Sequence, residues 1–217
     1  MATLLSVRMD EQHRYWSDTR RVGGVSEILK ATGFIRPNAF WTEEGRDKGT
    51  RLHLACRQVV TGTLDWNQVG ADIYFEVLCF VEWVNRVGFK ALKDIDGNFL
   101  CELLLISGIN WFAGTFDAFG TIHNGETLVL VDWKRGEAMA STAYQTALYV
   151  HLLCEHSLRL LGKRLYPWQV QRFALERIGK GKPHMEPFPD RKDLEVALAA
   201  VTCFNAQVEK GIIKLEN

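Results

Sequence analysis

A two-residue turn signal, Asn124-Gly125, lies between two segments rich in β-branched and aromatic residues, 111–120 and 127–133. Asn and Gly tolerate the left-handed backbone conformations that a tight hairpin turn requires. The two segments are therefore predicted to form adjacent antiparallel strands. A further turn at 108–110 predicts another strand before them, so the centre of the chain is expected to be an antiparallel meander.

Two carboxylates and an ammonium lie on this hairpin. Asp117 is on its first strand and Asp132 on its second, so the two acids are expected to lie close together. Side chains alternate along a strand, so Asp132 and Lys134 project to one face and the apolar residues between and before them project to the other. Adjacent carboxylates repel each other, and a divalent cation commonly offsets this repulsion. The pattern predicts a site that holds Mg²⁺ or Mn²⁺, activates a water and stabilises charge on a phosphate oxygen, as phosphodiester hydrolysis requires.

Four short motifs follow one another along the chain. They are Gly49-Thr50-Arg51-Leu52-His53, Gly114-Thr115-Phe116-Asp117, Asp132-Trp133-Lys134, and the pair Gln145 and Tyr149. In that order they resemble the Gly-x-x-x-His, Gly-x-x-Asp, Asp-x-Lys and Gln-x-x-x-Tyr motifs of the PD-(D/E)XK nuclease superfamily, and more closely of its RecB-like exonuclease branch. Each motif alone occurs by chance in many chains, whereas the four in this order are specific. The resemblance covers residues 22–176.

The resemblance implies a metal-dependent deoxyribonuclease, most closely a compact exonuclease of the kind used in phage-type recombination and repair. It implies that Asp117, Asp132 and Lys134 are the catalytic residues. The metal ligands would be His53, Asp117, Asp132 and the backbone carbonyl of Trp133, and the ion would be Mg²⁺ or Mn²⁺. A nitrogen ligand such as His53 shifts the preference toward Mn²⁺.

Three other side chains have both a functional and a simpler structural interpretation. Gln145 and Tyr149 are four residues apart on a predicted helix, so they share one face and are expected to bind the substrate. The simpler interpretation is ordinary helix packing for the tyrosine and a solvent-facing glutamine. Glu102, on the strand before the hairpin, could approach the site or could pair with a neighbouring base, and the sequence favours neither.

The expected partner is DNA with single- or double-stranded ends. Formal net charge is +0, so a DNA-binding surface has to come from uneven placement of charge. A homo-oligomer and a recombination partner protein are both compatible with the resemblance. Two alternatives stay open: a sequence- or structure-specific endonuclease on the same core, and a nucleic-acid-binding module without catalysis, since a fold does not fix function.

The predicted architecture is a single domain over residues 1–217, with an α+β mixed sheet and a restriction-endonuclease-like αβββαβ core that carries extra N-terminal helices. A hydrophobic content of 47% is sufficient for one well-buried core. The expected elements are a short helix capped by Ser26, helices at about 44–60, 71–87, 141–161 and 191–210, strands at about 99–106, 111–120, 127–133 and 168–176, and a Gly/Pro/Lys-rich loop at 179–183.

Cysteine usage and hydropathy indicate a cytoplasmic protein. No apolar stretch approaches the length of a membrane span, and the first residues show no signal or transit pattern. The five cysteines include no Cys-x-x-Cys pair and are expected to be reduced thiols. One branch of the resembled family holds an iron-sulfur cluster through one upstream cysteine and three closely spaced ones near the end. The C-terminal region here offers only Cys203, so no cluster is expected.

Overall fold

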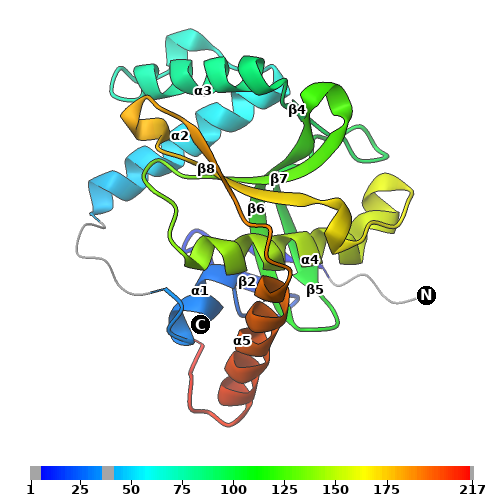
Figure 1. Ribbon diagram of the computed structural model, residues 1–217. Helices are drawn as coiled ribbons and strands as arrows, with labels where there is room; N and C mark the ends of the chain where they lie inside the picture. The colour runs from blue at the N-terminus through cyan, green and yellow to red at the C-terminus, as the bar shows by residue number, and fades with distance from the viewer. Residues whose placement is uncertain (1–5, 36–41, 216–217) are drawn as a thin grey trace.

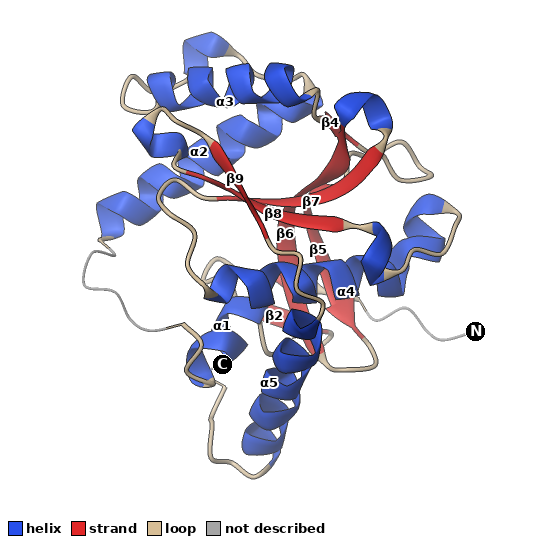
Figure 2. Cartoon of the chain, viewed as in Figure 1, coloured by secondary structure: helices blue, strands red, loops and turns tan. Residues whose placement is uncertain are grey.

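The computed structural model describes residues 6–35 and 42–215 and has an α+β fold built on one mixed, curled sheet (Figures 1 and 2). Its α-helices are α1 (Val25–Ala31), α2 (Glu43–Thr61), α3 (Tyr74–Val87), α4 (Ser141–Leu161) and α5 (Lys192–Glu209). Its short 3-10 helices are η1 (Trp66–Gln68), η2 (His123–Gly125), η3 (Pro167–Gln169) and η4 (Ile178–Lys180). Within the described ranges, none of the helices has the length and apolar character needed to cross a membrane.

The strands form a small N-terminal sheet and a larger central one. The small sheet contains β1 (Arg8–Met9), β2 (Tyr15–Ser17) and β3 (Arg20–Val22). The central sheet contains β4 (Lys90–Ala91), β5 (Cys101–Ser107), β6 (Phe112–Ile122), β7 (Thr127–Trp133), β8 (Gln171–Glu176) and β9 (His184–Pro187). Its order is β4-β6-β7-β8-β9, and β5 pairs with β6 as well. The predicted antiparallel meander is present as β5-β6-β7, and α4 carries the chain from β7 to its parallel neighbour β8.

Helices cover both faces of the central sheet. In Figure 1, α2 and α3 lie above it, and α1, α4 and α5 lie below. The upper core packs Val129, Val131 and Trp133 of β7 against residues of α2 and α3 such as Leu52 and Phe80. The lower core packs the other face of the same strands against α1, α4 and α5. The alternation of apolar side chains along β7 therefore follows the predicted pattern.

The connection between β6 and β7 is longer than the sequence predicts. Ile122 pairs with Thr127, so four residues connect the strands, and His123–Gly125 forms a single 3-10 turn rather than a two-residue hairpin. Gly125 does adopt the left-handed conformation, with φ 96°. The two-residue prediction was wrong because β6 does not end at Gly120. Ile122 is 3% exposed and packs in the upper core, and this burial extends the strand.

Other boundaries shift for local reasons. Helix α1 begins earlier than predicted, because its N-cap is Gly24 rather than Ser26, and the Glu27 carboxylate accepts the Gly24 N–H at 3.1 Å. Strand β8 starts at Gln171 because the residues before it form η3. Helix α4 has the predicted bounds. Strands β1, β2, β3, β4 and β9 were not predicted, because each contains only two to four residues, too few for a clear alternation of apolar and polar side chains.

Candidate metal centre

The candidate centre lies where the β6–β7 ladder ends. The last backbone pair of that ladder is Ala118 with Val131, so the next positions along the two strands are Asp117 and Asp132. The Trp133 N–H donates to the Asp117 carboxylate. A carboxylate thus satisfies a backbone donor that the departing strand would otherwise leave unpaired in a buried region. The Asp117 carboxylate therefore accepts the last backbone donor at the end of the ladder and also faces the candidate site.

The strand alternation breaks at the level of Asp117. Phe116 packs in the lower core and Ala118 in the upper core, although residues two apart on a regular strand share a face. The neighbours of Glu102 on β5 are divided between the two cores in the same way. Glu102 itself has φ 50°, which is uncommon and mildly strained for a residue other than glycine. On β5 and on β6 the side chains thus switch from one face of the sheet to the other, at Glu102 and Asp117, which lie opposite each other.

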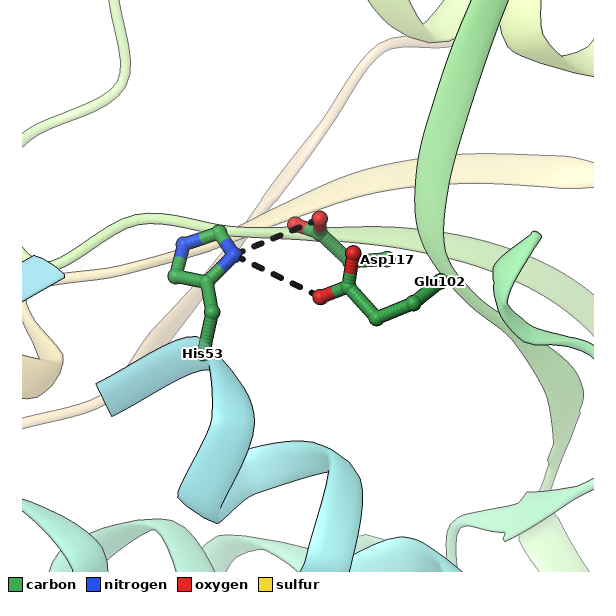
Figure 3. A group of neighbouring side chains, drawn as sticks. All are labelled: His53, Glu102 and Asp117. Atoms are coloured by element: carbon green, nitrogen blue, oxygen red, sulfur yellow. Dashed lines mark ion pairs between the residues drawn. The ribbon is translucent and has the colours of Figure 1, made fainter. Parts of the chain in front are cut away.

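His53, Glu102 and Asp117 converge on one point (Figure 3). His53 projects from α2, and its Nδ1 lies 3.4 Å from Asp117 Oδ1 and 3.7 Å from Glu102 Oε1. One ligand atom from each residue lies within 4.8 Å of the others. An imidazole with two carboxylates suits Mn²⁺ or Mg²⁺, and the nitrogen favours Mn²⁺. The structure thus brings Glu102, undecided from sequence, beside two of the predicted ligands.

Asp132 and Lys134 form a second part of the site, on the side of α4. Asp132 is 2% exposed, and its Oδ2 lies 2.8 Å from Lys134 Nζ. No other group among the described residues donates to that oxygen. Asp132 does not join the compact group of His53, Glu102 and Asp117. A buried carboxylate oxygen with one cationic neighbour and no further donor has the coordination capacity that a metal ligand needs.

Gln145 and Tyr149 continue this part of the site along α4. Lys134 Nζ lies 3.3 Å from Gln145 Oε1, and Gln145 Nε2 donates to the Tyr149 hydroxyl at 3.0 Å. Tyr149 is only 6% exposed, and a Cβ on Gly114 would lie 2.8 Å from its ring. The glycine of the Gly-x-x-Asp motif therefore leaves room for this ring. The packing alternative describes Tyr149 well, and its hydroxyl also orients Gln145; substrate contact by either residue stays a prediction.

Trp133 contributes packing through its side chain. It is fully buried, and its ring lies 5.4 Å from that of Phe80 and 6.0 Å, edge-on, from that of His53. The indole is thus directed into the upper core and supports the histidine. The predicted metal ligand at this position is the backbone carbonyl, and that role stays a prediction.

The sequence also missed an ion-pair network beside the centre. Glu76, on α3, is 5% exposed and binds the Arg135 guanidinium through contacts of 3.1 and 3.2 Å. It also lies 3.3 Å from Lys48 Nζ. A buried acid with two cationic partners fixes both of them. Arg135 is thereby held next to Lys134, its neighbour in the chain.

A second group of metal-ligand types is less suited to a cation. Glu176, His184 and Glu186 lie together on β8 and β9. The buried Glu176 carboxylate already accepts the Ala138 N–H at 2.7 Å and lies 3.1 Å from Arg177 Nε. The other two side chains are exposed. Since the one buried ligand is already satisfied, the group around His53 is the stronger candidate.

Burial and neighbouring charges set the protonation states. Burial alone would lower the pKa of His53, but Asp117 and Glu102 raise this pKa to about 10. Burial would raise the pKa of Asp117, but His53, Lys134 and the Trp133 N–H lower it. Burial raises the pKa of Asp132 to about 6 despite the attraction of Lys134. At neutral pH His53 is therefore an imidazolium, and a cation that binds there has to displace its proton.

Mn²⁺ should raise the melting temperature by at least ~3 °C more at about pH 8 than at about pH 5.5. Below a pH of about 6 Asp132 is protonated, and above it the ionised carboxylate can bind the cation. Competition from the His53 proton also weakens as the pH rises toward 10. Thermal melts with and without Mn²⁺ at the two pH values measure the difference. Asp132→Asn should reduce this difference between the two pH values, whereas the exposed control Asp96→Asn should leave it unchanged. If Mn²⁺ raises the melting temperature of the wild type equally at both pH values, Asp132 is not a ligand of the cation.

No family model matches the sequence, and no curated protein matches it either. Motif order and site geometry are therefore the grounds on which function can be proposed. Among the predicted residues, His53 and Asp117 meet in one group with Glu102. The others form a chain of contacts that runs from Asp132 through Lys134 to α4.

Proposed function

We propose that this protein is a Mg²⁺- or Mn²⁺-dependent deoxyribonuclease of the RecB-like branch of the PD-(D/E)XK superfamily, and most closely an exonuclease acting in recombination or repair. The observation that carries the proposal is that the group of His53, Glu102 and Asp117 and the Asp132–Lys134 ion pair lie at the same end of one strand ladder. Apart from the two-residue strand β4, which lies between α3 and β5, the order of the longer elements is α3-β5-β6-β7-α4-β8, and this order supports a restriction-endonuclease-like αβββαβ core. The proposed partner is DNA.

The donor set fits a hard divalent cation. His53, Glu102 and Asp117 would hold it, and Asp132 with the Trp133 carbonyl would complete its coordination. When bound, the cation supplies positive charge that stabilises the negative charge developing on a phosphate oxygen under attack. Glu102 is the one member of this set that the motifs do not contain.

Lys134 acts as a fixed cation in this proposal. Burial would lower its pKa, but Asp132 and Asp117 raise it, so Nζ keeps its proton at neutral pH. A protonated Nζ can donate to a phosphate oxygen or orient a water, but it cannot accept a proton. Gln145 holds the ammonium from the side of α4 at 3.3 Å, which limits its freedom before substrate arrives.

The test compares an end-labelled linear DNA with a closed circle of the same sequence, each incubated with Mn²⁺, Mg²⁺ or EDTA. We expect progressive loss of the linear DNA only, and only with a metal ion. Asp117→Asn and Asp132→Asn should each reduce cleavage by at least about 10²-fold, because each removes a charged ligand. Asp96→Asn, an exposed acid on the 94–98 turn, is the matched control and should cleave normally.

Each other outcome selects an alternative. Cutting of the closed circle would favour an endonuclease on the same core. Binding of DNA without cutting under any metal would favour a non-catalytic module. Cleavage that survives both aspartate substitutions would exclude this centre as its source.

A further inference from the structure

A basic loop, residues 177–182, follows β8 and has the sequence Arg-Ile-Gly-Lys-Gly-Lys. Its backbone is hydrogen-bonded to the segment that follows Asp132-Trp133-Lys134. The N–H groups of residues 177, 178 and 179 donate to the carbonyls of Gly136, Lys134 and Arg135 at 2.7, 3.4 and 2.9 Å. Lys134 N–H in turn donates to the Leu175 carbonyl at 2.8 Å. The loop is therefore fixed beside the candidate centre.

The loop is anchored at Ile178, Gly179 and Gly181. Ile178 is fully buried in the upper core. A Cβ on Gly179 would lie 2.7 Å from the Arg135 side chain. Gly181 has φ +66°, and a Cβ there would lie 2.4 Å from the Phe75 ring. The absence of a side chain at both glycines allows the loop backbone to approach Arg135 and Phe75 closely. The loop therefore has a defined shape, and its lysines project outward.

The outward side chains of the loop are cationic and accessible. The Arg177 and Lys180 side chains are 47% and 59% exposed, and Lys182 is also exposed. Two acids contact the cations of the loop. Arg177 Nε lies 3.1 Å from the buried Glu176 carboxylate, whereas Lys180 Nζ lies 2.9 Å from Glu137, which is itself 60% exposed. Exposed ion pairs of this kind contribute little to stability. A phosphate group can therefore replace Glu137 at a small cost.

We infer that the basic loop binds the sugar-phosphate backbone of a nucleic-acid strand at phosphates next to the one held at the metal centre. The position of that strand rests on the proposed function. Lysine ammonium groups offer point charges without the fork geometry that reads base edges, so the contact is independent of sequence. The protein as a whole has formal net charge +0, and this loop places positive charge in the chain segment bonded to the one that follows Asp132.

The test is the salt dependence of binding of a fluorescein-labelled oligonucleotide, followed by anisotropy in EDTA so that no strand is cut. For Lys180→Ala/Lys182→Ala we expect binding about tenfold weaker at about 50 mM salt, and a slope of log K against log[salt] smaller by ~1.4–1.8, because two phosphate contacts are lost. The control Lys210→Ala/Lys214→Ala removes the same charge from exposed lysines beyond α5. It should match the wild type within about twofold.

A double variant at 180 and 182 that behaves like the control would overturn the inference. So would a wild-type protein whose binding shows no salt dependence. Thermal melts of both variants test folding, and Lys180→Glu provides a second variant that should weaken binding further than Lys180→Ala. Since cleavage is not needed here, failure of the loop inference and failure of the nuclease proposal are separate results.

Discussion

Replacing Lys134 with methionine should reduce metal-dependent DNA cleavage by about 10³-fold. Methionine keeps the unbranched apolar stem but removes the ammonium, which lies 2.8 Å from Asp132 Oδ2 and 3.3 Å from Gln145 Oε1. A phosphate bound at the proposed centre would then lose the cationic side chain that Asp132 and Gln145 hold at this position. Single-turnover cleavage of end-labelled DNA in Mn²⁺ measures the loss without interference from product release.

Two controls separate charge from packing at this position. Lys163→Met changes an exposed lysine after α4 in the same way and should leave the cleavage rate unchanged. Lys134→Arg keeps the charge with a different shape and should recover part of the activity. A Lys134→Met protein that cleaves at the wild-type rate would refute the assigned role of Lys134, provided that its melting temperature is unchanged.

Replacing Trp133 with alanine should lower the free energy of unfolding by ~3–5 kcal/mol, because a fully buried indole would leave a large cavity. Trp133 is 0% exposed and packs against Phe80 and His53. This loss corresponds to a melting temperature lower by ~6–20 °C in a protein of this size. Urea denaturation and thermal melts both measure it.

The matched control is Trp168→Ala. Trp168 is 63% exposed and stacks on Tyr166 with the ring centroids 4.6 Å apart. We expect a loss below ~1 kcal/mol, as is usual for exposed positions. Equal losses at the two tryptophans would contradict the burial of Trp133. Cleavage should fall in Trp133→Ala as well, because the residue lies between Asp132 and Lys134 in the chain.

Elements with a long, regular pattern of apolar residues could be predicted from the sequence. Helix α4 has the predicted bounds because its apolar residues recur over more than five turns. Strand β7 also has the predicted bounds, since its alternating apolar residues face two different cores. By contrast, β1 to β3 contain only two or three residues each, and the exposed arginines Arg8 and Arg20 interrupt the apolar pattern by which a strand is recognised.

The candidate site also contains residues whose positions could be predicted from the sequence and residues whose positions could not. The order of the motifs predicts that His53, Asp117 and Asp132 lie near one another. The helix and the two strands that carry these residues could each be predicted from the sequence. The position of Glu102 depends on a left-handed residue inside a strand, and glutamate has no local preference for that conformation. The network around Glu76 depends on how α3 packs over the end of β7, which is a tertiary contact with no local sequence signal.

The hydrogen bond from the Trp133 N–H to the Asp117 carboxylate links chemistry to architecture. One side chain serves as an acid of the site and as a substitute for a backbone acceptor in the sheet. A relative without any catalytic activity would still be constrained at this position, because an apolar replacement would leave the buried Trp133 amide without an acceptor. Glu102 accepts no backbone donor in the described part of the chain, so it has no comparable structural role. In relatives without catalytic activity we therefore expect Glu102 to be replaced more readily than Asp117.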